Sequence, residues 1–258
     1  MIVVKFGGTS LGNATRFLEV STTLDDMMGK RPVVVVSAIG GVTNLLLRAC
    51  EEAVHGRSLY DELLSIHHKA IVGVGLPLEP FEPLFESLRS SLEAIALTGN
   101  ASPLQIDGVL SHGEMLSARI LALLLTSRGI PATDWHAGSA GMVTTAEFGW
   151  ARPLPKAPTM AREWYNSLDG SVPVVTGFLG KTEDGATTTL GRGGSDLSAA
   201  WFAAALGAEE LQIWTDVSGV MSADPRLVSD ARSIPELSFD EASEMAFKIG
   251  RASCRERV

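Results

Sequence analysis

The stretch that decides the fold is Val33-Val34-Val35-Val36-Ser37-Ala38-Ile39-Gly40-Gly41. Four consecutive valines are typical of a β-strand covered on both faces, as found mainly in parallel sheets. This strand runs into a loop with two glycines, and a helical pattern begins at about Thr43. A buried strand, a glycine loop and a helix in this order predict one unit of an α/β fold.

The same order recurs along the chain. Residues 2–6 read as a buried strand that ends at Gly7-Gly8, and a helix is expected from Asn13 through Met28. Further strands are expected at 131–136, 142–145, 172–178 and 211–215. Because strands alternate with helices, the chain is predicted to form a mostly parallel sheet with helices on its faces.

Composition is that of a soluble globular protein. The 258 residues carry a formal charge of −9, with 45% hydrophobic and 20% charged residues. The negative charge argues against nucleic acid as a partner, and no apolar run reaches membrane-spanning length. The chain starts directly as a predicted strand, without a signal peptide, and contains two cysteines, Cys50 and Cys254. A cytoplasmic location is therefore expected.

A second informative stretch, residues 185–196, combines four glycines, three threonines, a serine, an arginine and an aspartate. An apolar helical run follows from Leu197 to Leu206. Backbone N–H groups freed by glycine, followed by a helix N-terminus, form an anion-binding site. Arg192 adds a planar fork suited to a carboxylate or phosphate. Taken alone, the stretch is also compatible with a surface hairpin that leads into a helix cap.

Polar motifs follow the predicted strands at the points where the strands end. They are residues 7–10, Ser37 with Thr43, Gly177, and Thr215-Asp216. Ligands of open α/β sheets bind at the carboxyl ends of the strands. The sequence therefore predicts a ligand site at this edge of the sheet.

Two charged residues, Lys5 and Glu114, are candidates for this ligand site. Lys5 closes the first strand, where its point charge suits a β- or γ-phosphate; the alternative is a strand-end lysine that faces solvent. Glu114 follows Ser111-His112-Gly113, which reads as the opening of a long helix. A first-turn glutamate often only complements the helix dipole or forms a capping box with Ser111. The functional alternative is recognition of a substrate ammonium group.

The segment after the last strand adds further polar groups. Thr215 and Asp216 follow the strand directly, and Asp224-Pro225-Arg226 comes shortly after. Asp-Pro is a common turn, but strand-end acids beside a phosphate loop can also organise Mg²⁺, which needs few protein ligands when a nucleotide supplies others.

Several other site types lack support in the sequence. There is no Gly-x4-Gly-Lys-[Ser/Thr] P-loop, and no Gly-x-Gly-x-x-Gly follows a strand. The five histidines show no metal-ligand spacing, and His67 and His68 are expected on a helix surface. No pairing of Ser, His and Asp, or of Cys and His, favours a hydrolase.

Five segments, in this order, resemble the aspartate kinases of the amino-acid kinase superfamily. They are Lys5–Ser10, Val36–Leu45, His112–Ser117, Thr187–Ser198 and Trp214–Arg226. The resemblance runs from residue 1 to about Phe247. The absence of a long insertion before Glu114 makes the chain most like the lysine-sensitive monofunctional enzymes.

The resemblance implies a fold and an activity. The fold is a three-layer α/β sandwich over residues 1–247, with aspartate bound mainly by about 1–170 and ATP by about 171–247. The activity is ATP-dependent phosphorylation of the side-chain carboxylate of L-aspartate, the first step toward lysine, threonine and methionine. ATP and Mg²⁺ are the implied cofactors.

The resemblance also implies roles for individual residues. Lys5 would contact the transferring phosphate, and Asp196 would orient catalytic groups, Lys5 among them. The residues expected to hold the amino acid are Thr43, Glu114, Arg192 and Ser195. The residues expected to contact phosphate or nucleotide are Gly7, Gly8, Ser10, Ser37, Thr215, Asp216, Met221 and Arg226. At Met221 many relatives have tyrosine, so an aromatic contact is lost there.

The chemistry is consistent with these residues. A carboxylate nucleophile is already ionised near neutral pH, so no general base is needed. Catalysis then reduces to alignment and charge neutralisation, which lysine, glycine N–H groups and Mg²⁺ supply. A bidentate contact from Arg192 to the α-carboxylate, with Glu114 on the α-ammonium, would select an amino acid over a simple diacid.

The C-terminal part departs from the family pattern. Residues 248–258 have no family counterpart and read as foreign sequence after a truncation, and the ACT-type regulatory domains are absent. Because the family's dimer contacts involve the regulatory part, a homodimer is expected of the full-length protein.

Three alternatives remain open at this point. The first is a sibling kinase acting on glutamate, acetylglutamate, carbamate or UMP, against which the contexts of Glu114 and Arg192 argue. The second is the kinase half of a bifunctional enzyme fused to homoserine dehydrogenase. The third is an ATP-binding module without turnover.

Overall fold

The computed structural model describes residues 1–215, 219–223 and 227–248. By its internal contacts the chain divides into two compact units, Met1–Trp214 and Thr215–Val258. The first unit contains the sheet and most of the predicted site residues. The contact boundary follows Trp214, whereas the predicted functional boundary lies near residue 170, and the division of substrate binding between two parts stays a prediction.

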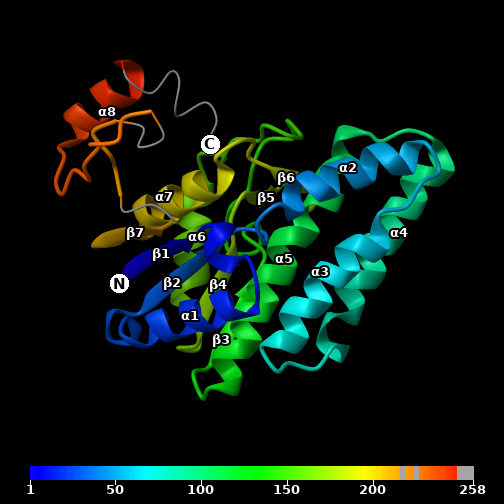
Figure 1. Cartoon of the computed structure of the whole chain (residues 1–258), viewed down its shortest axis with the longest axis horizontal. Helices are drawn as coiled ribbons and strands as arrows, with labels where there is room; N and C mark the ends of the chain where they lie inside the picture. Colours follow the sequence, from blue (N-terminus) through cyan, green and yellow to red (C-terminus); the bar gives the residue numbers. More distant parts are fainter. Residues whose placement is uncertain (216–218, 224–226, 249–258) are drawn as a thin grey trace. The chain divides into compact units, whose positions relative to one another are not determined.

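A five-stranded sheet lies at the centre of the first unit (Figure 1). Its spatial order is β3 (Ala132–Trp135), β4 (Val172–Thr176), β2 (Pro32–Val36), β1 (Ile2–Phe6) and β7 (Glu210–Trp214). Every pairing is parallel, which confirms the predicted sheet. The register places Phe6 between Val36 and Trp214, so the carboxyl ends of β1, β2 and β7 lie level with one another.

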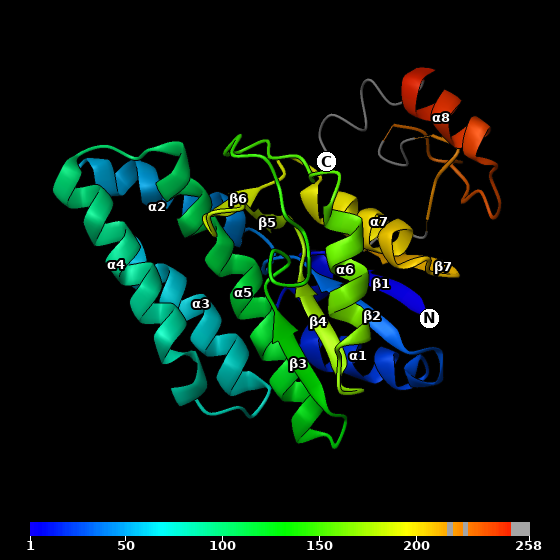
Figure 2. The same ribbon diagram turned by 180° about the vertical axis from the view of Figure 1, so that it is seen from behind.

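Alternate side chains of the strands enter two separate cores, because successive residues point to opposite faces of a sheet. Ile2, Val4 and Phe6 pack in the core that contains α1 (Ala14–Asp25) and α5 (Pro103–Ser127). Val3, Val33 and Val35 pack in the core with α6 (Ala157–Asn166) and α7 (Gly194–Leu206). Helices therefore cover both faces, and the three-layer α/β sandwich is confirmed (Figure 2).

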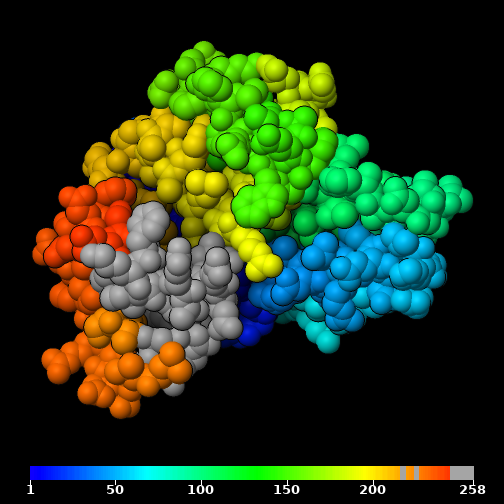
Figure 3. All heavy atoms as spheres, turned by 90° about the horizontal axis from the view of Figure 1, so that it is seen from above, coloured from blue at the N-terminus to red at the C-terminus, as the bar shows by residue number. Residues whose placement is uncertain are grey.

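Three further helices extend the layer that contains α5. They are α2 (Val42–Val54), α3 (Tyr60–Gly73) and α4 (Glu82–Thr98), and α2 and α4 both pack against α5. In the space-filling view this blue-to-teal group projects to one side of the first unit (Figure 3). Short 3-10 turns, at Thr9–Leu11, Met28–Lys30 and Glu79–Phe81, connect the elements.

The 185–196 stretch contains both a hairpin and a helix start. β5 (Leu179–Lys181) and β6 (Thr187–Thr189) pair in antiparallel fashion, and α7 begins at Gly194. The expected strand at 142–145 is not formed, because its pairing is limited to isolated bridges from Val143 and Thr144. The expected helix start at Asn13 is confirmed, since the Asn13 side chain accepts a hydrogen bond from the Arg16 N–H.

The long helix α5 begins earlier than the sequence suggested. A capping box between Ser102 and Gln105, with Pro103 in the first turn, fixes its start. Glu114 therefore lies in the interior of α5, so the predicted helix opening at Ser111 is wrong and the alternative of a first-turn capping role for Glu114 is excluded. The helix is long and apolar enough to span a membrane, yet 78% of its most apolar window is buried within the protein. That burial identifies α5 as the central helix of the core.

The expectation that His67 lies on a helix surface is also wrong. His67 on α3 is fully buried, and its Nδ1 lies 2.7 Å from the carbonyl oxygen of Leu63. Its ring packs edge-on against Phe85 of α4. Burial lowers the pKa of His67 to about 4, so the imidazole is neutral at neutral pH. The α3 helix is covered by α1 and α4, which a helical pattern alone does not reveal.

Within the second unit, the structure describes Thr215, 219–223 and 227–248. Residues 220 and 222 form backbone hydrogen bonds with 234 and 232, which makes a short ladder around Met221. Ser238 and Glu241 cap α8 (Phe239–Lys248) reciprocally. The residues expected to be foreign sequence, 248–258, lie outside the described residues beyond Lys248.

We predict that truncation of Leu121, fully buried on α5, costs about 2–5 kcal/mol of unfolding free energy in Leu121→Ala. The matched control is Leu97→Ala, because Leu97 on α4 is 89% exposed and its truncation is expected to cost less than about 0.5 kcal/mol. Urea unfolding followed by circular dichroism measures both. Equal losses in the two variants would contradict a core centred on α5.

Candidate active site

The glycine loops that follow β1 and β2 pack directly against each other at the carboxyl edge of the sheet. The Gly40 N–H donates to the Gly8 carbonyl oxygen at 3.0 Å, and the Ser37 N–H donates to Phe6 at 3.2 Å. A Cβ atom on Gly8 would lie 2.9 Å from the carbonyl oxygen of Ala38, so only glycine fits there. The predicted meeting of Gly7, Gly8 and Ser37 at one edge is therefore present.

Lys5 lies on the α7 side of β1, because it alternates with residues of the opposite face. Its Nζ is 2.6 Å from Oδ1 of Asp196 in the first turn of α7. The lysine side chain is 10% exposed and that of the aspartate 49%. A buried stem with its charge at the sheet edge differs from a solvent-facing lysine, so that alternative for Lys5 is excluded.

The start of α7 is fixed against the end of β4. Gly177 lies directly against Ser195, and the Phe178 N–H donates to the Ser198 hydroxyl at 2.9 Å. The Ser198 hydroxyl in turn donates to the Gly194 carbonyl oxygen at 2.8 Å. These contacts place Ser195 and the first N–H groups of α7 beside the strand ends, where a helix N-terminus attracts anions.

Glu114 of α5 points into the same edge from the other side of the sheet. Its Oε1 accepts a hydrogen bond from the Ala38 N–H at 3.1 Å, whereas Oε2 has no partner among the described residues. Burial raises the pKa of Glu114 to about 8, because the charged form loses its hydration. A buried carboxylate oxygen without a partner is costly, and a cation that reached it would be held strongly.

Two residues of this region, Asp107 and Trp150, were not predicted from the sequence. Asp107, also on α5, is buried and accepts hydrogen bonds from Thr189 and Gly149. Trp150 lies against Gly191, next to Arg192. The signal for Asp107 was its place seven residues before Glu114, because two turns of a helix bring both carboxylates to one face.

The remaining predicted residues differ in their relation to this edge. Thr43 is half-buried in the first turn of α2, and Arg192 is exposed in the turn before α7, without an ion pair to any described residue. Ser10 donates to the carbonyl oxygen of Trp214 at 3.4 Å. Thr215 and Met221 belong to the second unit. Asp216 and Arg226 lie outside the described residues.

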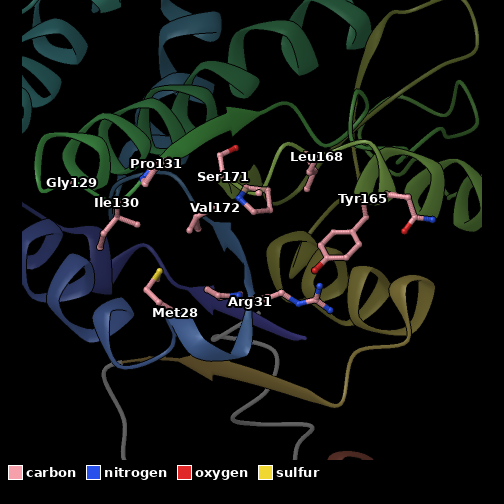
Figure 4. A pocket seen from close by; sticks show the side chains of 13 residues that line it. Met28, Arg31, Gly129, Ile130, Pro131, Tyr165, Leu168, Ser171 and Val172 are labelled. Atoms are coloured by element: carbon pink, nitrogen blue, oxygen red, sulfur yellow. The ribbon is translucent and has the colours of Figure 1, made fainter.

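A separate cavity of about 560 Å³ opens at the amino ends of β2 and β4, opposite the candidate site (Figure 4). Met28, Arg31 and Tyr165 line it, with Val172 at the start of β4. It contains no residue that the sequence predicted for the site. The described residues also contain no cluster of three His, Cys, Asp or Glu side chains suited to a metal ion.

Known proteins resemble this chain in sequence. The profile of the amino acid kinase family matches residues 1–253. The chain belongs to the amino acid kinase family. It is 39% identical over 256 residues to Aspartokinase 1, chloroplastic, of Arabidopsis thaliana, covering 95% of this chain and 45% of that protein. It is 36% identical to Lysine-sensitive aspartokinase 3 of Escherichia coli K12, covering 95% of this chain and 56% of that protein.

Solved structures show the same likeness. The crystal structure of E. coli aspartokinase III in complex with aspartate and ADP matches with a TM-score of 0.85 and 34% identity, covering 96% of this chain and 56% of that one. An isopentenyl phosphate kinase structure, at 16% identity and a TM-score of 0.50, shares the fold alone. The chain spans about half the length of the curated relatives it matches.

We predict a pH-dependent difference in stability between the wild type and Glu114→Gln. The folded-state pKa of about 8 exceeds the ordinary value of 4.5, so the folded protein binds the extra proton between these values. Wild-type unfolding free energy therefore falls as pH rises through this window, whereas the isosteric amide lacks this loss. Urea unfolding from pH 5 to pH 8.5 should show Glu114→Gln gaining on the wild type as pH increases.

The exposed Glu93→Gln on α4 controls for removal of one carboxylate. Stability curves of Glu114→Gln and wild type that stay parallel across this pH range would contradict a protonated, buried Glu114.

Proposed function

We propose that this chain catalyses transfer of the γ-phosphoryl group of ATP to the side-chain carboxylate of L-aspartate. One observation carries the proposal: the Lys5–Asp196 pair belongs to the same edge of the sheet as Oε2 of Glu114, which has no partner among the described residues. The Lys5–Asp196 pair suits a transferring phosphate, and Oε2 of Glu114 suits an ammonium group. E. coli aspartokinase III, whose structure resembles that of this chain, was crystallised with aspartate and ADP, which supports the same pair of ligands here.

Recognition of the amino acid is assigned to Glu114, Arg192, Thr43 and Ser195. An ammonium group that reaches Oε2 of Glu114 stabilises the carboxylate form and lowers its pKa from about 8. Arg192 is exposed and its guanidinium can bind the α-carboxylate with two hydrogen bonds. Together these two charges favour an amino acid over a simple dicarboxylate.

Phosphate binding is assigned to the glycine loop after β1 and to the start of α7. Gly7, Gly8 and Ser10 follow Lys5, with Ser37 on the adjacent loop. The α7 N-terminus supplies backbone N–H groups and the positive end of its dipole. Thr215, Asp216, Met221 and Arg226 remain proposed nucleotide contacts.

The reaction needs alignment rather than proton abstraction. A side-chain carboxylate oxygen of the substrate attacks the γ-phosphorus, a P–O bond forms, and the bond to the β-phosphate oxygen breaks to release ADP. The ammonium of Lys5 neutralises charge on the transferred group, and Asp196 holds that ammonium in place.

We further infer that Mg²⁺ enters with the nucleotide. Magnesium usually keeps several water ligands and binds through phosphates and one or two carboxylates. This requirement fits a site whose described residues form no three-ligand metal cluster. Bound Mg²⁺ would supply charge neutralisation on the phosphates, with Asp216 as the protein carboxylate proposed nearby.

Location and assembly complete the proposal. A cytoplasmic location rests on the low cysteine content of the chain. A homodimer of the full-length protein rests on the family resemblance.

We predict that Lys5→Ala lowers kcat for aspartyl phosphate formation by about 10²–10³, because one preorganised charge at the transferred group is lost. Hydroxamate trapping with Mg-ATP and L-aspartate measures the product. Lys30→Ala is the matched control, because Lys30 also pairs with an acid, Glu210 at 3.1 Å, but at the amino end of β2. It is expected to retain wild-type kcat.

L-glutamate in place of L-aspartate tests substrate choice in the same assay. Product from glutamate alone would overturn the substrate assignment. ATP binding without hydroxamate from either amino acid would instead favour a binding module without turnover.

A further inference from the structure

Asp107 joins two loops that lie far from it in the sequence. Its Oδ2 accepts hydrogen bonds from the N–H groups of Gly149 at 2.9 Å and Thr189 at 2.8 Å. Its Oδ1 accepts from the Thr189 hydroxyl at 2.8 Å. The Ala151 N–H also donates to the Thr189 carbonyl oxygen at 2.9 Å. One carboxylate on α5 thus holds the end of β6 and the 149–151 turn together, where β6 runs beside α5 (Figure 2).

The loop held in this way leads directly to Arg192. Gly191 follows two residues after Thr189, and a Cβ atom on it would lie 2.8 Å from the Trp150 ring. The turn from Gly191 to Gly194 closes with a backbone hydrogen bond of 3.0 Å, and α7 begins at Gly194. Arg192 therefore lies between Gly191, which packs against the Trp150 ring, and the first turn of α7. These two contacts fix the position of its backbone.

A contribution to stability does not explain why the carboxylate of Asp107 is buried. The side chain is 1% exposed, and no described lysine, arginine or histidine pairs with it. Burial of a carboxylate without a cation is costly even when it is hydrogen-bonded, and burial raises the pKa of Asp107 despite its three hydrogen bonds. An acceptor that joins two N–H groups and a hydroxyl is, however, well suited to fixing a loop.

We propose that Asp107 is a positioning residue that sets the Arg192 turn opposite Glu114, and thereby sets the affinity for the α-carboxylate of the amino-acid substrate. Both carboxylates project from one face of α5, two turns apart, so the same rigid helix places both ends of the substrate. Asp107 does not touch the substrate. This inference rests on the proposed aspartate phosphorylation and identifies what governs substrate affinity within it.

The test compares Asp107→Ala, Thr189→Val and Thr188→Val in the hydroxamate assay. Asp107→Ala removes the acceptor of both backbone N–H groups and of the Thr189 hydroxyl, whereas Thr189→Val removes only the hydroxyl donor. Thr188→Val is the matched control, because the Thr188 hydroxyl is equally buried but bonds to Thr144 at 2.7 Å. We expect KM for aspartate to rise about tenfold in Asp107→Ala and less in Thr189→Val, with KM for ATP within about twofold.

A purely structural role would lower stability without this selective change in KM. Hydrogen exchange of peptides that span residues 187–195 provides a readout independent of activity, and exchange should accelerate in Asp107→Ala. Unchanged exchange overturns the inference, as does a KM for aspartate that stays constant or rises equally in Thr188→Val. A wild-type protein that forms no aspartyl phosphate overturns the proposed function itself, whichever way exchange responds.

Discussion

The parallel pairing of β1 on both sides is the constraint on which the rest of the site depends. Because β2 and β7 flank β1 in register, three strand ends lie level, and the loops that follow them share one edge. The same pairing decides which face receives Lys5. A shift of one residue would turn Lys5 into the α5 core and separate it from Asp196 of α7. The proposed contact between Lys5 and phosphate therefore depends on the register of the sheet.

The helix α5 introduces the second constraint, because it carries two buried carboxylates into the core. Glu114 approaches the loop after β2 and Asp107 approaches the end of β6. Each lowers stability relative to an apolar residue of similar size unless its hydrogen bonds are met. The partners of Asp107 are all provided by the protein, whereas one oxygen of Glu114 has none among the described residues. This asymmetry is consistent with the proposed positioning role of Asp107 and the proposed role of Glu114 in binding the amino acid.

The fold could be read from the sequence because its signals are local. The valine run at 33–36 and the glycines after each strand indicated parallel units, and the strand ends indicated the site edge. The start of α5 was missed, since Ser102 and Gln105 form a capping box upstream of a motif that resembles a helix opening. The burial of His67 and the bonds of Asp107 depend on contacts between distant segments. Such contacts leave no periodic pattern in a single sequence.

The measurement that tests the central claim most directly is calorimetric titration of the protein with L-aspartate at pH 7, in buffers of different ionisation enthalpy. If the ammonium of the substrate binds Oε2 of Glu114, a carboxyl whose pKa is about 8 when empty must lose its proton. Binding is therefore predicted to release close to one proton in the wild type and none in Glu114→Gln. Binding without proton release, or no binding of aspartate, would contradict the assignment of this edge as an amino-acid site.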